Sequence, residues 1–493
     1  MVTGRLTFTL AALCGCAALA AGCGAASSAG GGAAGIVPTS VPAYIAIDTD
    51  PDSSQWQTVD DLASRFPDKQ KGIDTLKAEL RKEGIDYDQD VKPALGPEID
   101  VVWLDFAHNG EDIVGLMQPR DEDAFKRFVA KGNAKNPTDK LFYEKDGDWE
   151  VFSNKQALVD RFLRESGAGG AKLADDPTFK SAMGSTSDDS LVKAYVSGQK
   201  VMDAITSYGG PDAAKLIDQA GTLDWLTAGL RASPDGVRFD AVVRGTPGKL
   251  LRNAYATPSF HASLPERVPA DALLYLGFHG TEGMLDNFDA IPGLSAQLRP
   301  VAGLLRSVGA LLQGEDALYV RESAAGSTLV TEPKIPEITL VTEPKPGTDG
   351  VATLDGIIGK YAKQLSAQPE PATFGAVQGR KLDLGAFQID YANVGDKFVV
   401  TDLPQGILSL ASPSSTLAQS DAFKDAADAS GLPSNTQGFV YVDVRGGVGL
   451  VQKLANAPIP ADVARNLKPL RSAVEYALTR PSEVQVTFFL QIK

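Results

Sequence analysis

The chain has 493 residues, of which 43% are hydrophobic and 22% charged, a composition typical of globular proteins with two to four domains. Its formal net charge is −15, and no lysine- or arginine-rich run offsets it, so nucleic acids and acidic head groups are poor partners. All three cysteines, Cys14, Cys16 and Cys23, lie near the amino terminus. The rest of the chain therefore offers no thiol for a disulfide, a zinc site or a cysteine nucleophile.

The first 22 residues have the pattern of an export signal. Arg5 is their only charged residue, and an apolar run over residues 6–21 follows it. The run ends at Ala20-Ala21-Gly22-Cys23, which resembles a bacterial lipobox, where small residues precede a cysteine that is lipidated. We therefore expect residues 1–22 to be a lipoprotein signal peptide. Acyl chains on Cys23 would then anchor the protein to the membrane, on its extracytoplasmic side.

Two alternatives remain open at this terminus. Leu13-Cys14-Gly15-Cys16 is a competing frame for lipidation, and an ordinary cleaved signal peptide fits the same charge pattern. Cys23 is preferred because it leaves an apolar run of normal length and precedes a segment rich in glycine, alanine and serine. We expect that segment, residues 23–40, to be a flexible tether, since it has too little apolar surface to fold.

A first copy of a folded unit is predicted over residues 41–262. It opens with Val41-Pro42-Ala43 and a short strand, and two helices with apolar residues at helical spacing follow. Further along come two strands, a helix, a hairpin with a Gly-Asp turn at Gly147, more helices, a strand, a helix and a closing strand. Asn154 is a candidate N-cap for the helix after the hairpin.

A second copy is predicted over residues 263–493, because fragments of the first recur there in the same order. Leu173–Met183 and Leu417–Ala427 share five of eleven positions, including Phe179-Lys180 and Phe423-Lys424, whose phenylalanines we interpret as core anchors. Val41-Pro42-Ala43 matches Val268-Pro269-Ala270, and the strand pair 98–106 and 112–118 matches 315–321 and 337–342. Further along, the hairpin 143–153 matches 391–401, and Asn154 matches Asp402.

Hairpins and short connections favour antiparallel pairing, with helices packed against the sheet. The predicted fold class is therefore α+β, as two tandem related units, each a mostly antiparallel sheet.

Several of these fragments together resemble a known family. They are the Val-Pro-Ala-Tyr run ending at Tyr44, an aspartate-rich loop with Trp56, the run Asp90–Gly96 and the Phe-Lys block. In this order they are similar to bacterial exported proteins catalogued as domain of unknown function 3352, over about residues 41–490. The resemblance implies an exported setting and brings no assigned activity with it.

The aspartates that follow the first strand resemble the start of a calcium loop. Asp48, Asp50 and Asp52 match the start of such a loop, but Ser53 stands where glycine is needed and Val59 where glutamate is needed. The preferred interpretation is a strand end that runs into a helix with an acidic first turn. A weak calcium site is the alternative, and no metal site is predicted.

No catalytic or cofactor-binding residue emerges from the remaining motifs. Ser197 and Lys200 match S-x-x-K, but no K-T-G follows, and the sequence contains no G-x-S-x-G or phosphate-binding loop. The chain has only three histidines, which show no metal-ligand spacing: His108, His261 and His279.

The functional expectation is a non-enzymatic envelope lipoprotein that binds or scaffolds an unidentified ligand near the membrane, with no cofactor. One alternative is a carrier of lipids or other hydrophobic ligands, for which an apolar helix at 298–312 could line a groove. The preferred interpretation of that helix is a core helix between two sheets. The other alternative is an extracytoplasmic hydrolase that uses paired carboxylates held at a defined separation across a cleft.

Overall fold

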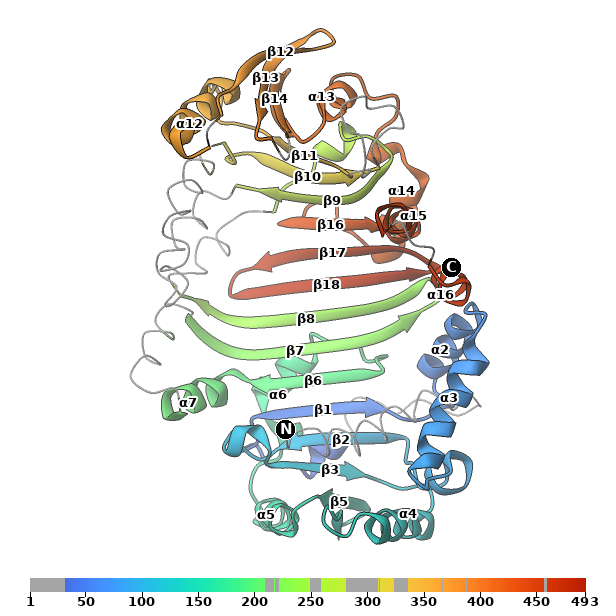
Figure 1. Cartoon of the computed structure of the whole chain (residues 1–493). Coiled ribbons are helices and arrows are strands. Elements are labelled where there is room, and N and C mark those ends of the chain that lie inside the picture. The colour runs from blue at the N-terminus through green and yellow to red at the C-terminus, as the bar shows by residue number, and fades with distance from the viewer. Residues whose placement is uncertain are drawn as a thin grey trace. The chain divides into compact units, whose positions relative to one another are not determined.

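The structure is a computed structural model, and it describes residues 32–208, 217, 221–248, 259–280, 309, 311–322, 336–365, 367–385, 388–455 and 459–493 (Figure 1). The chain divides into two compact units. Unit 1 contains the described residues up to Ile217 and Thr222–Thr246, and unit 2 contains Gly221 and Pro247–Ile492. Each unit is described by itself.

Unit 1 is built on one antiparallel sheet with the strand order β4-β5-β3-β2-β1-β6-β7. A two-residue turn then leads into β8, which lies beside β7 in Figure 1. The strands are β1 (Ala43–Asp48), β2 (Glu98–Trp103), β3 (Ile113–Met117), β4 (Phe142–Asp146), β5 (Trp149–Ser153), β6 (Val192–Ser197), β7 (Gly221–Ser233) and β8 (Gly236–Pro247).

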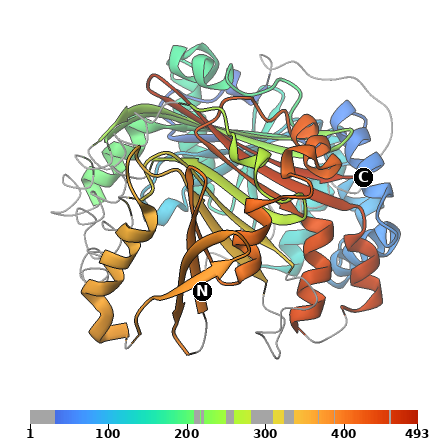
Figure 2. The same cartoon turned by 90° about the horizontal axis from the view of Figure 1, so that it is seen from above.

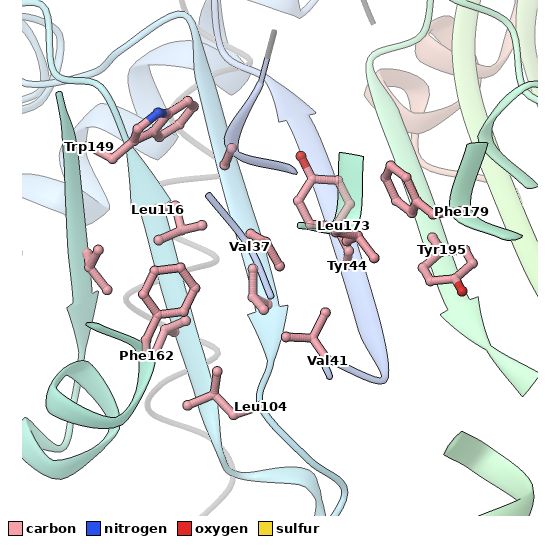
Figure 3. Packing of buried hydrophobic residues seen from close by; sticks show 14 of the residues in the cluster. Val37, Val41, Tyr44, Leu104, Leu116, Trp149, Phe162, Leu173, Phe179 and Tyr195 are labelled. Carbon is pink, nitrogen blue, oxygen red and sulfur yellow. The ribbon is translucent and has the colours of Figure 1, made fainter. Parts of the chain in front are cut away.

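Helices cover both faces of this sheet, but not over its whole length. They are η1 (Ala33–Gly35), α2 (Ser54–Ser64), α3 (Lys69–Lys82), η2 (Tyr87–Val91), η3 (His108–Gly110), α4 (Glu122–Lys135), α5 (Gln156–Gly167), η4 (Leu173–Asp175), α6 (Pro177–Met183) and α7 (Gly198–Tyr208). One face meets η1, α5, η4 and α6 in the larger core, part of which Figure 3 shows. On the other face, α3, η2 and α4 pack over β2, β3 and β5 in a smaller core.

Unit 2 has the strand order β12-β13-β14-β15-β11-β10-β9-β16-β17-β18, again antiparallel throughout. The strands are β9 (Ala272–His279), β10 (Glu315–Arg321), β11 (Glu337–Thr342), β12 (Glu370–Phe374), β13 (Val377–Asp383), β14 (Gln388–Val394), β15 (Lys397–Thr401), β16 (Gly438–Asp443), β17 (Leu470–Arg480) and β18 (Glu483–Ile492).

The helices of unit 2 are η6 (Leu264–Glu266), α12 (Gly350–Leu365), α13 (Pro404–Ala411), η8 (Leu417–Gln419), α14 (Asp421–Ser430), α15 (Val444–Ala455) and α16 (Ala461–Leu467). One face of the sheet meets η6, α13, η8 and α14 in the larger core. Against the other face α12, the orange helix of Figures 1 and 2, packs near β14 and β15 in a smaller core.

The two units share one topology, and the predicted α+β class with two related antiparallel units is confirmed. If β12 and β13 are set aside as an inserted hairpin, β9, β10, β11, β14, β15, β16, β17 and β18 follow the strand order of β1 to β8. The core anchors also correspond. Phe179 meets Tyr195 edge-on with ring centres 5.0 Å apart, and Phe423 meets Tyr441 edge-on at 5.2 Å (Figure 3 labels the first pair).

The start of the first copy differs from the sequence prediction. Leu173 donates its N–H to the carbonyl of Val37 (2.7 Å), as Leu417 does to Val268 (2.8 Å), and isolated bridges join Pro38 to Lys172 and Pro269 to Thr416. The equivalent of Val268-Pro269 is therefore Val37-Pro38, and the match to Val41-Pro42 is wrong.

The tether prediction consequently fails for residues 32–40. Ala33 and Val37 are fully buried in the core of unit 1, because the η1 turn directs them there as η6 directs Leu264 in unit 2. The abundance of small residues in this stretch concealed two core positions. Residues 23–31 lie outside the described part of the chain, so the prediction of a tether there stays a prediction.

Local signals explain which other elements the sequence reveals. Gly147 and Gly395 adopt positive φ (+61° and +65°) in the two predicted hairpin turns, as a tight turn requires. The N-cap predictions are wrong: α5 begins after Lys155 and α13 after Leu403, and neither has a side-chain cap. Asp402 instead accepts a hydrogen bond from the Ile338 N–H (2.8 Å).

Candidate functional site

The two faces of each sheet differ in how completely helices cover them. Side chains alternate between faces along a strand, so Tyr44, Val102 and Tyr195 point into the larger core of unit 1, and their sequence neighbours point to the other face. We call this second face, in either unit, the open face.

On the open face of unit 1, three rows of apolar residues cross β3, β2, β1, β6 and β7. Strand register aligns them as Ile113–Trp103–Ala43–Val196–Leu226, Gly115–Val101–Ile45–Ala194–Ala228 and Met117–Ile99–Ile47–Val192–Leu230. The smaller core covers Ile99 and Met117, whereas the residues of β1, β6 and β7 beyond Ala43 are all partly exposed. Phe239 on β8 is 39% exposed.

Unit 2 repeats the pattern over six strands, from β11 through β10, β9, β16 and β17 to β18. Its rows are Ile338–Val320–Leu274–Val442–Ala473–Leu490, Leu340–Leu318–Leu276–Val440–Glu475–Phe488 and Thr342–Asp316–Phe278–Gly438–Ala477–Val486. Only Glu475, Thr342 and Asp316 in these rows are polar. Ile338 is 42% exposed and Phe488 41% exposed.

Exposed large apolar side chains concentrate on the open faces. Among the described residues five such side chains are exposed, and Phe239, Ile338 and Phe488 are three of them; the other two are Val451 on α15 and Val463 on α16. Single exposed apolar residues need no explanation, but contiguous apolar surface marks a site where a protein or an apolar ligand binds. The open face is therefore our candidate site.

Asp316 is the unusual member of these rows. It is fully buried, with no hydrogen-bond partner for either carboxylate oxygen, and the hydroxyl of Thr342 opposite it on β11 also lacks a partner. Burial raises the pKa of Asp316 to about 8, and the nearby carboxylates of Glu315 and Glu343 add to the shift. Glu315 itself is satisfied, since it accepts from the N–H and hydroxyl of Ser263 and from the N–H of Leu264.

The larger core of unit 1 contains a pair of neighbouring carboxyls. Tyr44 donates its hydroxyl to Asp100 (2.5 Å), and burial raises the pKa of Asp100 well above its usual range, with Glu98 beside it adding to the shift. Asp100 is fully buried, so no substrate reaches it in this conformation. In unit 2, Ala317 occupies the equivalent place, so the acid is not shared by the two copies.

An ion pair at one position, in contrast, recurs in both units, although only the pair in unit 2 is fully buried. Arg321 on β10 binds both carboxylate oxygens of Glu337 (2.6 and 2.8 Å), and the same guanidinium contacts Ser409 on α13. The acid equivalent to Glu337 is Asp112, and its arginine, Arg161, comes from α5, with its guanidinium nitrogen 3.9 Å away. The position of Arg161 on α5 corresponds to that of Ser409 on α13. The arginine therefore comes from the helix in unit 1 and from the strand β10 in unit 2.

The family model described as "Protein of unknown function (DUF3352)" matches residues 6–145 and 129–479. The chain belongs to this DUF3352 family. No curated protein matches it. Among solved structures, crystal form IV of TP0453 is 14% identical (TM-score 0.25; 46% of this chain and 78% of that chain), and crystal form III is 10% identical (TM-score 0.24; 47% and 85%). At these TM-scores the likeness defines no common fold.

In this DUF3352 protein, the aspartates that resemble the start of a calcium loop form local turns. The carboxylate of Asp48, at the end of β1, accepts from the Asp50 N–H (2.8 Å), and that of Asp50 accepts from the Asp52 N–H (3.2 Å) and contacts Arg120. Ser53 caps α2. Within the described ranges, no group of three His, Cys, Asp or Glu side chains could hold a metal ion.

The other residues singled out by sequence make separate local contacts. His108 bonds Asp112 (3.1 Å), His261 lies within 3.0 Å of the Ser434 carbonyl, and the ring of His279 packs on Phe260. The Ser-x-x-Lys motif spans the end of β6 and the first turn of α7. Sequence analysis missed the open face altogether, because its rows depend on strand register.

Two predictions from the sequence concern parts of this chain that lie outside the described residues. They are the lipidation of Cys23 and the apolar helix at 298–312, of which only residues 309, 311 and 312 are described. Leu311 is buried in the smaller core of unit 2 with Ile357 and Phe398. In the part of the chain that the structure describes, no helix combines the length and apolarity needed to cross a membrane.

Proposed function

We propose that this protein is a membrane-anchored extracytoplasmic lipoprotein that binds the apolar chains of lipid-like ligands on its open faces, without catalysis. The observation that carries the proposal is the open face itself: three rows of apolar side chains, partly exposed, recur at equivalent positions in both units. A duplicated active site would need a shared set of polar residues. What the copies share on this face is apolar surface.

The energetics of such binding follow from the hydrophobic effect. Each methylene that a ligand buries contributes about 0.8 kcal/mol, so a chain of ten carbons lying along one row supplies several kcal/mol before the cost of immobilisation. The carboxylate hydrolase gains no comparable support, since the Asp100 carboxyl of this pair is fully buried and accepts the hydroxyl of Tyr44.

The location part of the proposal rests on Cys23 and the apolar run before it. Replacing Cys23 with serine removes the atom that carries the acyl chains, so the variant should shift from the membrane fraction to the soluble exported fraction. Fractionation of cells producing the two forms measures this. A Cys23→Ser protein that stays in the membrane fraction contradicts the anchor.

The binding part predicts that charge on the open face abolishes binding without unfolding the protein. We expect the double variant Phe239→Glu/Phe488→Glu to fold normally, because both side chains are already about two-fifths exposed, at 39% and 41%. Its affinity for an environment-sensitive fluorescent fatty acid should fall by roughly tenfold or more, since carboxylates replace apolar contacts.

The matched control for this experiment is Val463→Glu, which places the same charge at an exposed apolar residue on the helix α16 rather than on a strand of either sheet. It should bind the probe like the unmodified protein. Equal loss of binding in the control and the double variant would show that the probe responds to charge in general, and equal retention in both would remove the open face as the site.

A further inference from the structure

The open face of unit 2 carries an exposed charged side chain in the middle of its apolar rows. Glu475 on β17 lies in the second row, between Val440 on β16 and Phe488 on β18, and Ala473 and Ala477 flank it along its own strand. Its side chain is exposed, and none of these four neighbours has a polar side chain. The carboxylate is therefore accessible to a ligand and surrounded by apolar surface.

The shared fold does not require an acid at this position. The tyrosines that meet the two core anchors align β6 with β16, so Ala194 corresponds to Val440. Strand pairing then aligns Ala228 on β7, opposite Ala194, with Glu475, opposite Val440. The second row of unit 1 contains no charge, and Glu475 therefore gives the two open faces different chemistry on the same sheet.

A carboxylate in the row limits where an apolar chain can lie. Methylene groups placed over Glu475 would strip water from the charge without giving it a partner, which is costly. On one side of Glu475 only Phe488 continues the row, whereas on the other side four apolar residues continue it: Val440, Leu276, Leu318 and Leu340. Their strands β16, β9, β10 and β11 lie side by side (Figure 1), and at about 4.8 Å per strand the stretch is about 19 Å long. An apolar chain gains most of its contact on that side.

The polar end of such a ligand then meets the Glu475 carboxylate. A head group that donates a hydrogen bond gains a charge-assisted contact there. An anionic head group is repelled instead, and the repulsion grows as the ligand excludes water from the face. The position of Glu475 therefore selects both the direction of the chain and the charge of its end.

We propose that Glu475 binds the polar end of the ligand in unit 2, a head group that donates hydrogen bonds and carries no negative charge. The chain runs from there across β16, β9, β10 and β11. This inference rests on the proposed function and adds the charge class and the orientation of the ligand. It also makes the two faces unequal, because a chain with an anionic end binds in unit 1 in preference to unit 2.

The experiment uses the full chain with Phe239→Glu, which blocks the open face of unit 1 and leaves that of unit 2. Dodecanol and dodecanoate have the same twelve-carbon chain and differ in the head group, and each is titrated by calorimetry below its limit of monomeric solubility. Dodecanol should bind about fivefold more tightly than dodecanoate, the effect of two like charges about 4 Å apart in water.

Two variants at Glu475 show whether this residue causes the preference. Glu475→Gln keeps the shape and a hydrogen-bond acceptor, so dodecanoate should bind about fivefold more tightly than before and dodecanol within about twofold. Glu475→Ala, which copies Ala228 of unit 1, should give the same gain for dodecanoate. Both variants should fold normally because Glu475 is exposed, and circular dichroism checks this.

The matched control is Glu370→Gln, which removes the same charge from an exposed residue on β12, a strand outside the apolar rows. It should leave the affinities for both probes unchanged. An equal gain for dodecanoate in this control would show that the net charge of the chain causes the preference, and would overturn the role of Glu475.

The orientation is tested with a dodecanol that carries a photoreactive diazirine at the end of the chain farthest from the hydroxyl. Its cross-links should form on β9 or β10, which peptide mapping of the labelled protein reveals. Cross-links confined to β18 would overturn the proposed orientation.

The outcomes separate this inference from the function beneath it. If neither twelve-carbon probe binds, the proposed function fails. If both bind with equal affinity, or if Glu475→Gln leaves the preference for dodecanol unchanged, the open face still binds chains and only the role of Glu475 is overturned.

Discussion

Replacing Arg321 with leucine is expected to lower the unfolding free energy of unit 2 by about 3–5 kcal/mol at neutral pH, the usual effect of removing one partner from a buried ion pair. Arg321 is 7% exposed and Glu337 is fully buried. Without the guanidinium, the Glu337 carboxylate loses both of its short hydrogen bonds (2.6 and 2.8 Å) while it stays fully buried.

Two further variants show whether the loss of stability comes from the Glu337 carboxylate that is left buried without a cation. The double variant Arg321→Leu/Glu337→Leu should recover most of the loss, because a pair of apolar residues replaces a buried ion pair at little cost. Arg161→Leu in unit 1 should cost less than Arg321→Leu, since Asp112 keeps His108 at 3.1 Å and Lys155 at 3.8 Å. A double variant as unstable as the single one would contradict this explanation.

The measurement must distinguish the two units. All four tryptophans, Trp56, Trp103, Trp149 and Trp225, belong to unit 1, so tryptophan fluorescence follows that unit during denaturation. Hydrogen exchange of the strands β9, β10 and β16 follows unit 2, because amides in core strands exchange through the largest openings. Arg321→Leu should speed exchange there and leave the fluorescence transition of unit 1 unchanged.

The second large effect is expected at Asp316, as a dependence of stability on pH. Its pKa is about 8 in the folded state, against 3.8 for an ordinary aspartate. Between these values the folded state holds a proton that the unfolded state has released, so the stability contributed by this group is present at low pH and is lost as pH rises. The slope is at most about 1.4 kcal/mol per pH unit, and it ends near pH 8.

Asp316→Ile should remove this slope and make unit 2 more stable than the unmodified protein by several kcal/mol at pH 8. The gain should be smaller at pH 4, where only the buried neutral carboxyl without a partner is relieved. Isoleucine already stands at the equivalent position, Ile99, in unit 1. Hydrogen exchange of unit 2 strands, extrapolated over this pH range, measures the difference between the two proteins. Parallel pH profiles for the two would contradict a buried titrating carboxyl.

Much of the secondary structure can be predicted because the signal is local. The strands Glu315–Arg321 and Glu337–Thr342 have the bounds that the sequence predicts, and Trp56 and Leu62 lie on a helix as their spacing indicates. The sequence alone does not reveal β17, where Ala473, Val474, Ala477 and Leu478 recur at helical spacing. Pairing with β16 and β18 overrides that local preference.

The candidate site could not be predicted for a related reason. Ile45, Ala194 and Ala228 become neighbours only when β1, β6 and β7 pair in one register, and nothing in the local pattern of any one strand supplies that register. In the sequence, Asp316 is likewise one acidic residue among many, because its burial and its strand partners depend on the fold. Lipidation of Cys23 rests on the sequence pattern and stays a prediction.

The most direct test of chain binding on the open faces is native mass spectrometry of the protein released from its own envelope in a mild detergent. The proposal predicts an added mass on the folded protein that solvent extraction identifies as a molecule with a long apolar chain. It also predicts that the added mass is lost in Phe239→Glu/Phe488→Glu and kept in Val463→Glu. A folded protein that carries no ligand, or one whose ligand is equally retained by the double variant, would contradict the account.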